Sequence, residues 1–514
     1  MAKLNIPLPS KGLVVDRPAE YVDQRSAVNI KNIQLSRSVI QKRVGTAALG
    51  SSLAERVQRI FELQVGNASR LFRVGLTKVE VLNKSTEVWS SVAYAALTGT
   101  AEDQVSYAFP LLSGDKIVCY TNGIDAIRKC AISGSDSALG GAPPKARYLQ
   151  AFGDYLVLAY VIDGGTPYYS RVQWSDTGNC ESWTPGGSSN AGSTDLLEDP
   201  EDITGLGVFG NFLTVHKSNS IYVGQIVSTS DVFRFDRKAT GVGACAGATI
   251  QNIPSGEQIF LASDGIHLFN GITAPLIESP IQDELREEMN PAYLYKSQSV
   301  FVEELDEYWV SVATGSDTEP QTVYKYNSRT KQIYKDYRTD LVSMGIFQNT
   351  QEDTWNDRTG AWDSDTTRWS SIANLSLNPR VLFGSSAGVT SERTSSSNND
   401  DGVAVESVWD TKDFTAEDFG GSDMDQLMRW KGLEVWAKGN TMTVYYSTDG
   451  GSTWTLASTL TLSSSDYPTD AAPVNCYFDV ISSRLRLRFY NAVAGESFTL
   501  KKYQIEAGMR EARK

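Results

Sequence analysis

The stretch DYLVLAYVIDGGTPYYSRVQW, residues 154 to 174, sets the pattern of the chain: two runs of β-branched, aromatic and other apolar residues flank an Asp-Gly-Gly turn. This composition is typical of a β-hairpin. Similar units recur from about residue 57 to residue 392, and the turns of five lie at Gly123, Gly164, Ser218, Gly265 and Ser328. Successive turns are 41, 54, 47 and 63 residues apart. Because a four-stranded propeller blade needs roughly 40–50 residues, the repeat predicts an irregular β-propeller over residues 57–395.

The segment before the propeller has a different pattern. Residues 1–56 contain Pro7, Pro9 and Pro18, which favour extended backbone. The same segment carries apolar residues that water would surround on an isolated tail, namely Ile30, Ile33, Leu35, Val39 and Ile40. We therefore expect an extended N-terminal arm that ends in one or two strands and packs on a neighbouring subunit.

The polar stretch SERTSSSNNDDG, residues 391 to 402, marks the end of the propeller. Beyond it, six or more short apolar runs in about 110 residues predict a C-terminal β-sandwich over residues 402–514. In one run Arg484, Arg486 and Arg488 alternate with apolar residues, so that strand should have a basic face and an apolar face. The predicted fold class is all-β, an irregular β-propeller with an extended N-terminal arm and a C-terminal β-sandwich.

Two insertions interrupt the propeller pattern. Residues 280–293, PIQDELREEMNPAY, begin with proline and acidic residues and reach Pro291, a pattern typical of a short helix. Residues 349–371 are polar and contain Trp355, Trp362 and Trp369. We expect this second insertion to be a surface loop with contacts outside its own blade.

The composition narrows the possible functions. The chain has 514 residues, a net charge of −14, a pI near 4.9 and no long basic run, so sequence-specific DNA binding is not expected. DNA can still pass a surface that repels it. Five scattered cysteines without a CxxC pair indicate buried free thiols. No apolar run reaches the ~18 residues of a membrane span, and MAKLNIPLPSKGL lacks the apolar core of a secretory signal, which predicts synthesis in a cytoplasm.

The stretch STDGGSTW, residues 447 to 454, matches the Asp-box pattern S-x-D-x-G-x-T-W. Asp boxes recur in sialidases and other glycan-active propellers, where they lie away from the active sites. One clear copy is present, and it lies outside the predicted propeller. We therefore interpret this stretch as a structural hairpin turn formed by Ser447, Asp449, Gly451 and Trp454.

The sequence offers little support for catalysis. Both histidines, His216 and His267, lie inside apolar runs, and neither a G-x-S-x-G elbow nor a phosphate-binding loop is present. The densest acidic groups, residues 195–206 and 303–309, are typical of solvated loops, and the first does not have the spacing of an EF-hand. We expect a non-enzymatic protein without catalytic residues, cofactors or bound metal.

The segment YYSRVQWSDTGNCESWTPGG, residues 168 to 187, is the most specific in the chain. It resembles a segment of the tail nozzle proteins of short-tailed bacteriophages, also called packaged-DNA stabilisation or tail tubular proteins. The residues that carry this resemblance are Trp174, Ser175, Asp176, Gly178 and Trp183. Further similar segments follow in the same order and comprise residues 5–13, 42–45 (KRVG), 201–224, 259–271 and 279–285. Cys180 replaces an expected proline, and KRVG replaces the usual Arg-Pro-Gly.

The resemblance covers roughly residues 5–340 and implies a virion protein made in the bacterial host cytoplasm. Members of this family form a homo-oligomeric ring, often a hexamer, below the portal and its adaptor or head-completion protein. The ring lines the DNA exit channel, retains packaged double-stranded DNA without reading its sequence, guides its ejection and docks a tail fibre, spike or plug. We expect contacts with neighbouring subunits or partners at Arg25, Lys31, Arg37, Lys42, Arg43, Trp355, Trp362 and Trp369.

Two other functions are compatible with the pattern. One is a propeller glycan hydrolase or depolymerase, which would have several Asp boxes and an arginine cluster on one propeller face. The other is a receptor- or glycan-binding tail module whose C-terminal sandwich performs the recognition, and such a module would have a repetitive trimeric shaft. The sequence shows one Asp box and no shaft-like region, so the ring subunit is the leading hypothesis.

Overall fold

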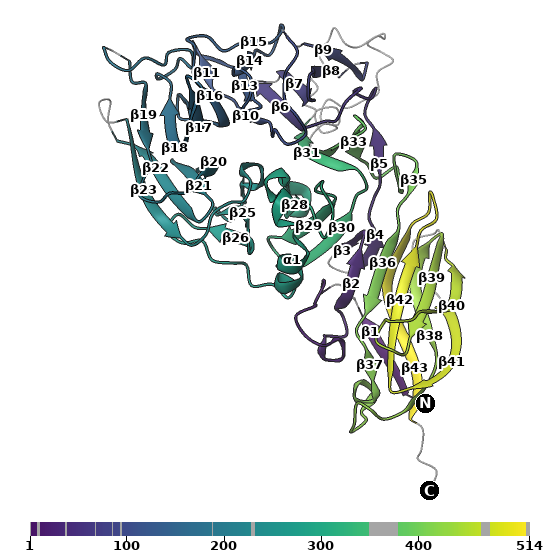
Figure 1. Cartoon of the computed structure of the whole chain (residues 1–514). Helices are drawn as coiled ribbons and strands as arrows, with labels where there is room; N and C mark the ends of the chain where they lie inside the picture. Colours follow the sequence, from purple (N-terminus) through teal and green to yellow (C-terminus); the bar gives the residue numbers. More distant parts are fainter. Residues whose placement is uncertain are drawn as a thin grey trace, which may run out of the picture.

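The computed structural model describes residues 2–7, 11–35, 39–66, 68–84, 86–92, 95–187, 189–227, 232–348, 379–463 and 473–509. These residues form a β-propeller and a β-sandwich that lies beside it, next to β30 and β5 (Figure 1). The structure confirms the predicted all-β fold class. Among the described residues, no helix is long and apolar enough to span a membrane.

The described part of the propeller contains seven blade sheets, all antiparallel except for one parallel pairing of β34 with β5 in blade 7, and a separate two-stranded sheet of β11 and β12. Blade 1 contains β6 (Arg59–Val65), β7 (Ala68–Val74), β8 (Val79–Asn83) and β9 (Val88–Ser91). Blade 2 contains β10 (Ser106–Ala108), β13 (Val118–Thr121), β14 (Arg128–Cys130) and β15 (Ser137–Ala138), with a small hairpin of β11 (Leu111–Leu112) and β12 (Asp115–Lys116). Blade 3 contains β16 (Lys145–Phe152), β17 (Tyr155–Asp163), β18 (Thr166–Trp174) and β19 (Gly192–Asp195). Blade 4 contains β20 (Ile203–Phe209), β21 (Phe212–Lys217), β22 (Ser220–Ile226) and β23 (Phe233–Thr240).

The remaining blades are less regular. Blade 5 contains β24 (Gln251–Asn252), β25 (Gln258–Ala262) and β26 (Gly265–Phe269). Blade 6 contains β27 (Gln298–Val302), β28 (Glu307–Val312), β29 (Thr322–Asn327) and β30 (Ile333–Tyr337). Blade 7 contains β31 (Leu341–Phe347), β32 (Arg380–Ser385), β33 (Thr390–Arg393), β5 (Thr46–Ala48), β34 (Asn399–Asp400) and β35 (Val403–Ala404). First strands of neighbouring blades contact one another, including β6 with β31, so these strands line the centre of a closed ring.

The turn markers in the sequence lie at hairpins of the structure, but not at the same strand-to-strand connection in every blade. Gly123, Gly164, Ser218 and Gly265 lie where the second strand of blades 2 to 5 leads into the third. Ser328 lies instead between the third and fourth strands of blade 6. This difference explains the long final spacing of 63 residues. The predicted helix is present between blades 5 and 6 as α1 (Gln282–Glu288), followed by a 3₁₀ helix over Pro291–Lys296. The second predicted insertion, residues 349–371, lies outside the described residues.

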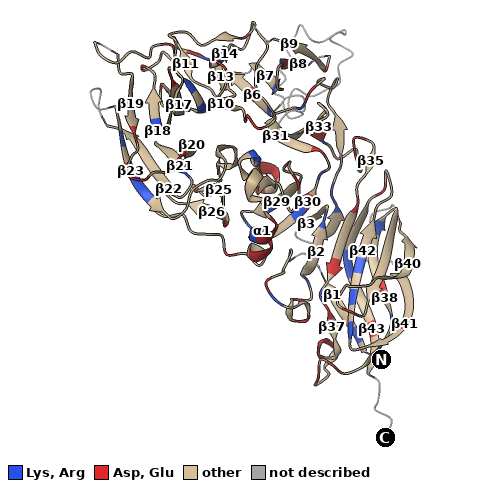
Figure 2. Ribbon diagram, viewed as in Figure 1, with Lys and Arg blue, Asp and Glu red and all other residues tan. Residues whose placement is uncertain are grey.

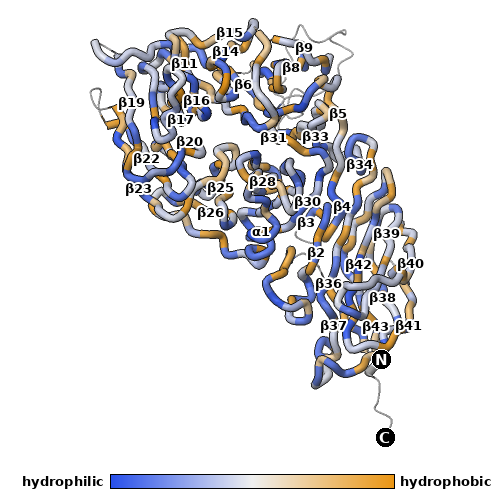
Figure 3. Tube along the Cα trace, viewed as in Figure 1, coloured by the Kyte–Doolittle hydropathy of each residue, from blue (hydrophilic) through white to orange (hydrophobic). Residues whose placement is uncertain are grey.

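The sandwich has two six-stranded sheets that combine both ends of the chain. One contains β1 (Ala2–Pro7), β3 (Ile33–Leu35), β4 (Ile40–Lys42), β38 (Met428–Gly439), β41 (Val474–Ser482) and β43 (Phe498–Met509). The other contains β2 (Ala27–Lys31), β36 (Ser407–Thr411), β37 (Phe414–Thr415), β39 (Thr441–Ser447), β40 (Thr455–Thr461) and β42 (Arg484–Asn491). Burial alternates residue by residue along β42, as its sequence predicts. Figure 3 shows hydrophilic and hydrophobic residues interspersed along the sandwich strands.

The expectation of a separate N-terminal arm that packs on a neighbouring subunit is wrong for the described residues. β1 and β4 pair with β43, and β2 pairs with β36, all within the same chain. These pairings bury Ile30, Ile33 and Ile40 completely, so their apolar side chains are covered without a neighbour. β5 then pairs with β33 and completes blade 7. Residues 1–56 are therefore divided between the two modules.

One large apolar core connects the modules. It combines Trp409 and Trp430 of the sandwich with Leu261 of blade 5 and Tyr308 of blade 6. The other clusters fill the spaces between adjacent blades. Central blade strands are packed on both faces, which explains why β17 is a nearly continuous apolar run. The sandwich and the propeller consequently share buried surface.

Candidate functional site: central cavity and module junction

The signature residues of the tail nozzle resemblance meet in one loop of blade 3, between β18 and β19. The Trp174 indole donates to the carbonyl of Asn190 at 2.9 Å, and Asp176 accepts hydrogen bonds from the backbone of Thr177 and Asn190. Ser175 Oγ accepts from the Leu156 backbone at 3.0 Å. Gly178 has a φ of +66°, and Trp183 is buried in the core between blades 2 and 3. These five residues hold a long loop in shape.

The Asp-box residues form a tight turn between β39 and β40. Ser447 Oγ lies 2.7 Å from Asp449 Oδ1 and accepts from the Gly451 backbone at 2.8 Å. Hydrogen bonds from Thr453 hold the pKa of the Asp449 carboxyl below its ordinary value. Trp454 lies under the Arg488 guanidinium, 3.9 Å from the ring centroid. The polar side chains of Ser447 and Asp449 therefore form hydrogen bonds within the turn itself.

The other polar candidates are also engaged within the chain. His216 is buried in blade 4, and desolvation lowers its pKa to about 4. Burial alone would raise the pKa of Asp199, but hydrogen bonds from Lys217, Tyr222 and Ser220 bring it below its ordinary value. The acidic loop before blade 4 is therefore tied to that blade. Among the described residues, no group of three or more His, Cys, Asp or Glu side chains is placed to hold a metal ion.

The residues expected to contact partners have different positions. Arg25 is half exposed and lies 3.7 Å from Asp23, while Lys31 pairs with Glu406 at 2.5 Å. Lys42 and Arg43 are only 3% and 2% exposed, so the expectation that they reach a partner is wrong. Lys42 is the last residue of β4 and Arg43 follows it. Both side chains bind partners within the same chain, Lys42 on Asn491 and Arg43 on Asp400. Four of the expected contact residues lie outside the described residues, namely Arg37, Trp355, Trp362 and Trp369.

A buried network of charges joins the sandwich to blades 6 and 7. Its three cations are Arg43, Lys325 and Arg338, and its three anions are Glu307, Asp336 and the half-buried Asp400. Arg43 donates to Asp400 at 2.5 Å and lies 3.6 Å from Asp336, which also pairs with Lys325. Burial lowers the pKa of Lys325 to about 8, against the opposing effect of Asp336. Balanced charge of this kind is tolerated in an interior only while every partner is present.

The backbone reinforces the same junction. Asn32, in the turn between β2 and β3, accepts hydrogen bonds from Arg43 and from the Tyr337 backbone in blade 6. Leu13 donates its N–H to the carbonyl of Ile333 at 3.2 Å. Gly45 passes so close to Asn399 that a Cβ there would lie 2.0 Å from its carbonyl oxygen. The KRVG segment thus passes directly from the sandwich into blade 7.

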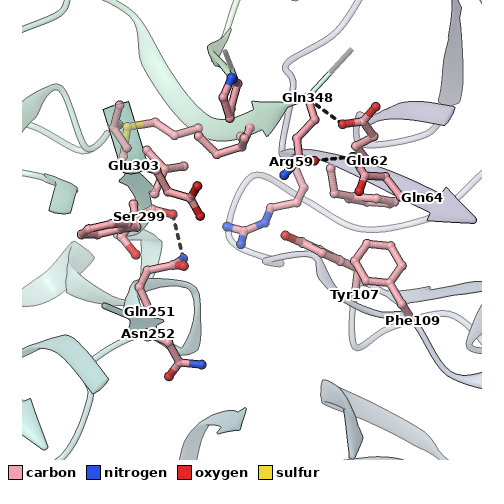
Figure 4. Close-up of a pocket in the computed structure, with 18 of the residues that line it drawn as sticks. Arg59, Glu62, Gln64, Tyr107, Phe109, Gln251, Asn252, Ser299, Glu303 and Gln348 are labelled. Carbon is pink, nitrogen blue, oxygen red and sulfur yellow. Dashed lines mark hydrogen bonds between the residues drawn. The ribbon is translucent and has the colours of Figure 1, made fainter. Parts of the chain in front are cut away.

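The propeller centre contains a cavity of about 460 Å³ (Figure 4). Its wall combines β6, the start of blade 2, β24, β27 and β31. Arg59 extends into it, with Tyr107 below and Glu303 on the far side (Figure 4). The Arg59 guanidinium carbon lies 5.3 Å from the Tyr107 ring centroid, and Phe109 contacts that ring edge-on at 5.4 Å. Four amide side chains complete the polar lining, those of Gln64, Gln251, Asn252 and Gln348.

This lining provides binding groups of several kinds. The arginine offers a fixed positive fork, the aromatic rings offer flat apolar faces, and the amides donate and accept hydrogen bonds. Sequence reasoning missed the cavity because its residues come from five blades. The one local signal was Arg59 at the start of the otherwise mainly apolar β6.

No family model and no curated protein matches the chain. The β-propeller domain of Cps50 (Swd1) from Myceliophteria thermophila is a similar solved structure, with 8% identity, a TM-score of 0.42 and coverage of 68% of this chain and 100% of that one. BamB from Moraxella catarrhalis has 13% identity, a TM-score of 0.34 and coverage of 73% and 95%. A glycoside hydrolase family 43 arabinoxylan arabinofuranohydrolase from Bacillus subtilis, solved with cellotetraose, has 12% identity, a TM-score of 0.28 and coverage of 89% and 97%. Likenesses at this level assign no activity, partner or ligand to this chain.

Proposed function

We propose that this protein is a structural virion subunit that forms a ring, the nozzle or hub, in the tail of a short-tailed bacteriophage. In this role the ring lies below the portal and adaptor, lines the DNA exit channel, retains packaged DNA and docks other tail components. The ordered resemblance of residues 5–340 to tail nozzle proteins supports the proposal.

The observation that carries the proposal is the way residues 2–48 are built into both modules. Four of their strands belong to the sandwich, and the fifth completes blade 7. The charge network around Arg43 then fixes the two modules to each other. A subunit that seals a pressurised channel must transmit force without bending at an internal hinge, and this construction provides such stiffness. A propeller also leaves few free sheet edges.

The charge distribution suits a surface that DNA passes without adhering. The net charge is −14. A strongly basic strand face, on β42, is visible as a blue stripe in Figure 2. Arg486 donates to Asp413 at 2.7 Å and Arg488 to Asp410 at 2.6 Å, so much of this stripe is neutralised. Phosphate binding depends on cations that can replace counterions, and paired arginines do so poorly.

Electron microscopy of the purified protein and of the virion tests the proposal. We expect a ring of identical subunits with an open channel of about 20 Å or more, since the major groove of a DNA duplex is already about 12 Å wide. The ring should occupy the tail below the adaptor. A protein that stays monomeric at all concentrations and is absent from purified virions contradicts the proposal.

The glycan hydrolase is tested with the same preparation. Release of reducing sugar from bacterial surface polysaccharide by the purified chain would favour the hydrolase over the ring. A ring without such release would leave the structural role as the explanation of the fold.

A further inference from the structure

Arg59 is a buried cation without an anion. Its side chain lines the central cavity, and the residue is 8% exposed. Its Nη1 donates to Gln298 at 2.7 Å, but its Nε has no hydrogen-bond partner, and no carboxylate of the described residues forms an ion pair with it. Two other buried cations differ in this respect: Arg73 pairs with Glu80 at 2.5 Å and Lys217 with Asp199 at 2.6 Å. Lys42 also has no carboxylate partner among the described residues, but its ammonium donates to Asn491 and to the Val493 carbonyl. A guanidinium cannot escape its charge by losing a proton, so an unpaired one in an interior is costly.

The carboxylates of the cavity do not compensate for this charge. Glu62 accepts from the Gln348 backbone at 2.7 Å and lies 3.4 Å from Lys84. Glu304 lies 3.8 Å from Arg393. Of the charges that line the cavity, these two are therefore neutralised by cations of the described chain.

Three charged groups then remain in the lining. Arg59 and Lys116 are cations and Glu303 is an anion, and none of the three has an ion-pair partner among the described residues. Among the described residues, Lys116 contacts the Phe109 ring, at 5.4 Å from its centroid. Lys116 and Glu303 are exposed, so water solvates their charges, whereas Arg59 is buried. Arg59 is therefore the charge that an anionic group of a ligand would balance.

The rest of the lining indicates what carries that charge. Glu303 is exposed at the cavity, and when ionised it accepts hydrogen bonds but cannot donate them, so it can bind donors of a ligand. The amides of Gln251 and Asn252 line the same cavity. The Tyr107 ring, on which Phe61 stacks at 4.4 Å, lies beside Arg59 with Phe109 edge-on to it. A simple aliphatic acid satisfies only the arginine. A hydroxylated ring with a carboxylate satisfies all of these groups, because its hydroxyls donate to Glu303 while one ring face packs on the aromatic side chains.

We infer that the central cavity of the propeller binds a carboxylated sugar, with the carboxylate on Arg59, the hydroxyls toward Glu303 and the amides, and the ring against Tyr107. A cavity of about 460 Å³ is within the size range of small-ligand pockets, about 300–1,000 Å³. This site is independent of the proposed ring, because all of its residues belong to one chain.

Isothermal titration calorimetry on the full-length protein tests the inference with four probes: glucuronate, glucose, acetate and inorganic sulfate. We expect glucuronate to bind more tightly than either glucose, which lacks the carboxylate, or acetate, which lacks the ring. Equal binding of glucose shows that the charge is not recognised, and equal binding of acetate or inorganic sulfate shows a general anion site. Each of these results, and the absence of glucuronate binding, overturns the inference.

The decisive variant is Arg59→Met, which keeps the length of the side chain but removes its charge. We expect glucuronate affinity to fall by about 10- to 100-fold, the worth of a charge-assisted hydrogen bond. The melting temperature without ligand should change little, because the variant also removes an uncompensated buried charge. The matched control is Arg234→Met, an arginine whose side chain is 68% exposed in blade 4, and it should bind glucuronate like the wild type.

A second variant, Tyr107→Leu, tests the inference even if Arg59→Met does not fold. Tyr107→Leu retains Arg59 but removes the aromatic face, and we expect glucuronate affinity to fall by about three- to tenfold. Unchanged affinity in either folded variant places the ligand elsewhere and overturns the inference. Ring formation seen by electron microscopy should be unaffected by both substitutions, so failure of the sugar site and failure of the proposed function are separate results.

Discussion

Lys42 is a single residue whose positive charge becomes buried when the chain folds. Its ammonium donates to Asn491 at 2.8 Å and to the carbonyl of Val493 at 3.4 Å. Burial, reinforced by the neighbouring Arg43, lowers its pKa to about 8. In the unfolded chain a lysine has a pKa of about 10.4, so between these two values the folded state holds fewer protons than the unfolded state. The contribution of Lys42 to stability must therefore rise with pH in that window.

Burial raises the pKa of Cys119, Cys130, Cys245 and Cys476, which opposes this trend in the wild type. The test is therefore a difference in slope: between pH 8 and pH 10 we expect the urea midpoint of Lys42→Met to rise less, or fall more, with pH than that of the wild type. The contribution of one such group is at most about 1.4 kcal/mol per pH unit. Lys325, whose pKa is also lowered to about 8, keeps part of the slope in the variant. Lys11→Met, at a side chain that is 43% exposed, is the control and should retain the full slope. An unchanged slope in Lys42→Met would show that Lys42 is solvated.

The sequence placed Lys42 and Arg43 on a contact surface for a simple physical reason. Basic residues in a polar segment are exposed by default, and the residues that bury these two are distant in sequence. Asn491 binds Lys42 across 449 positions, and Asp400 binds Arg43 across 357. No local pattern encodes such partners. By contrast, the Asp-box residues bond within four positions of one another, so their turn could be predicted from the sequence.

At the scale of elements, β5 is the strand on which closure of the propeller depends. It is only three residues long, yet it pairs antiparallel with β33, with Ala47 opposite Glu392. The backbone N–H of Leu49 extends this pairing to the carbonyl of Thr390 at 2.7 Å. Blade 7 thereby contains strands from both ends of the propeller segment, which fastens the ring against opening between blades 7 and 1.

We expect Ala47→Pro to open this closure, because proline removes a backbone donor and cannot continue an inner strand pairing. The cost should be about 3 kcal/mol. Limited proteolysis should then cut the chain near residues 49–58, which connect β5 to β6. Ala47→Ser keeps the N–H and should resist cleavage like the wild type. If both variants are equally resistant, β5 does not hold the ring closed.

The elements that could be predicted from the sequence are encoded by neighbouring residues, whereas the elements that were missed depend on partners far away in the chain. Blade hairpins such as residues 154–174 carry their own turn and apolar runs, so they were predicted. The Thr-Ala-Ala of β5 has no such pattern. The strands of the arm were recognised as apolar, but their partners lie at the far end of the chain: Ala2 pairs with Ala507, and Ala27 with Thr411. The central cavity was missed for the same reason, since distant segments assemble it.

At the scale of the whole molecule, the junction determines whether propeller and sandwich behave as one body. A cavity of about 310 Å³ lies between β2 and blade 6, so the modules are not in contact everywhere. The charge network around Arg43 and the shared apolar core are what connect them. A buried pair contributes little when complete, but removal of one member leaves an uncompensated charge.

Arg43→Met leaves Asp336 and Asp400 with one cation fewer, and we expect it to destabilise the protein by about 3–5 kcal/mol. The loss of stability should lower the urea midpoint. At urea concentrations below that midpoint, a protease should also cut the chain at new sites between the modules. Arg25→Met is the control, since Arg25 belongs to the same arm but its side chain is 45% exposed; its effect should stay within about 0.5 kcal/mol.

If Arg43→Met instead separated the modules without preventing ring assembly, the ring would not need a stiff subunit. The stiffness of the junction would then no longer support the proposed nozzle. If the variant lost ring assembly while each module stayed folded, the junction itself would be the part of the subunit that the ring requires.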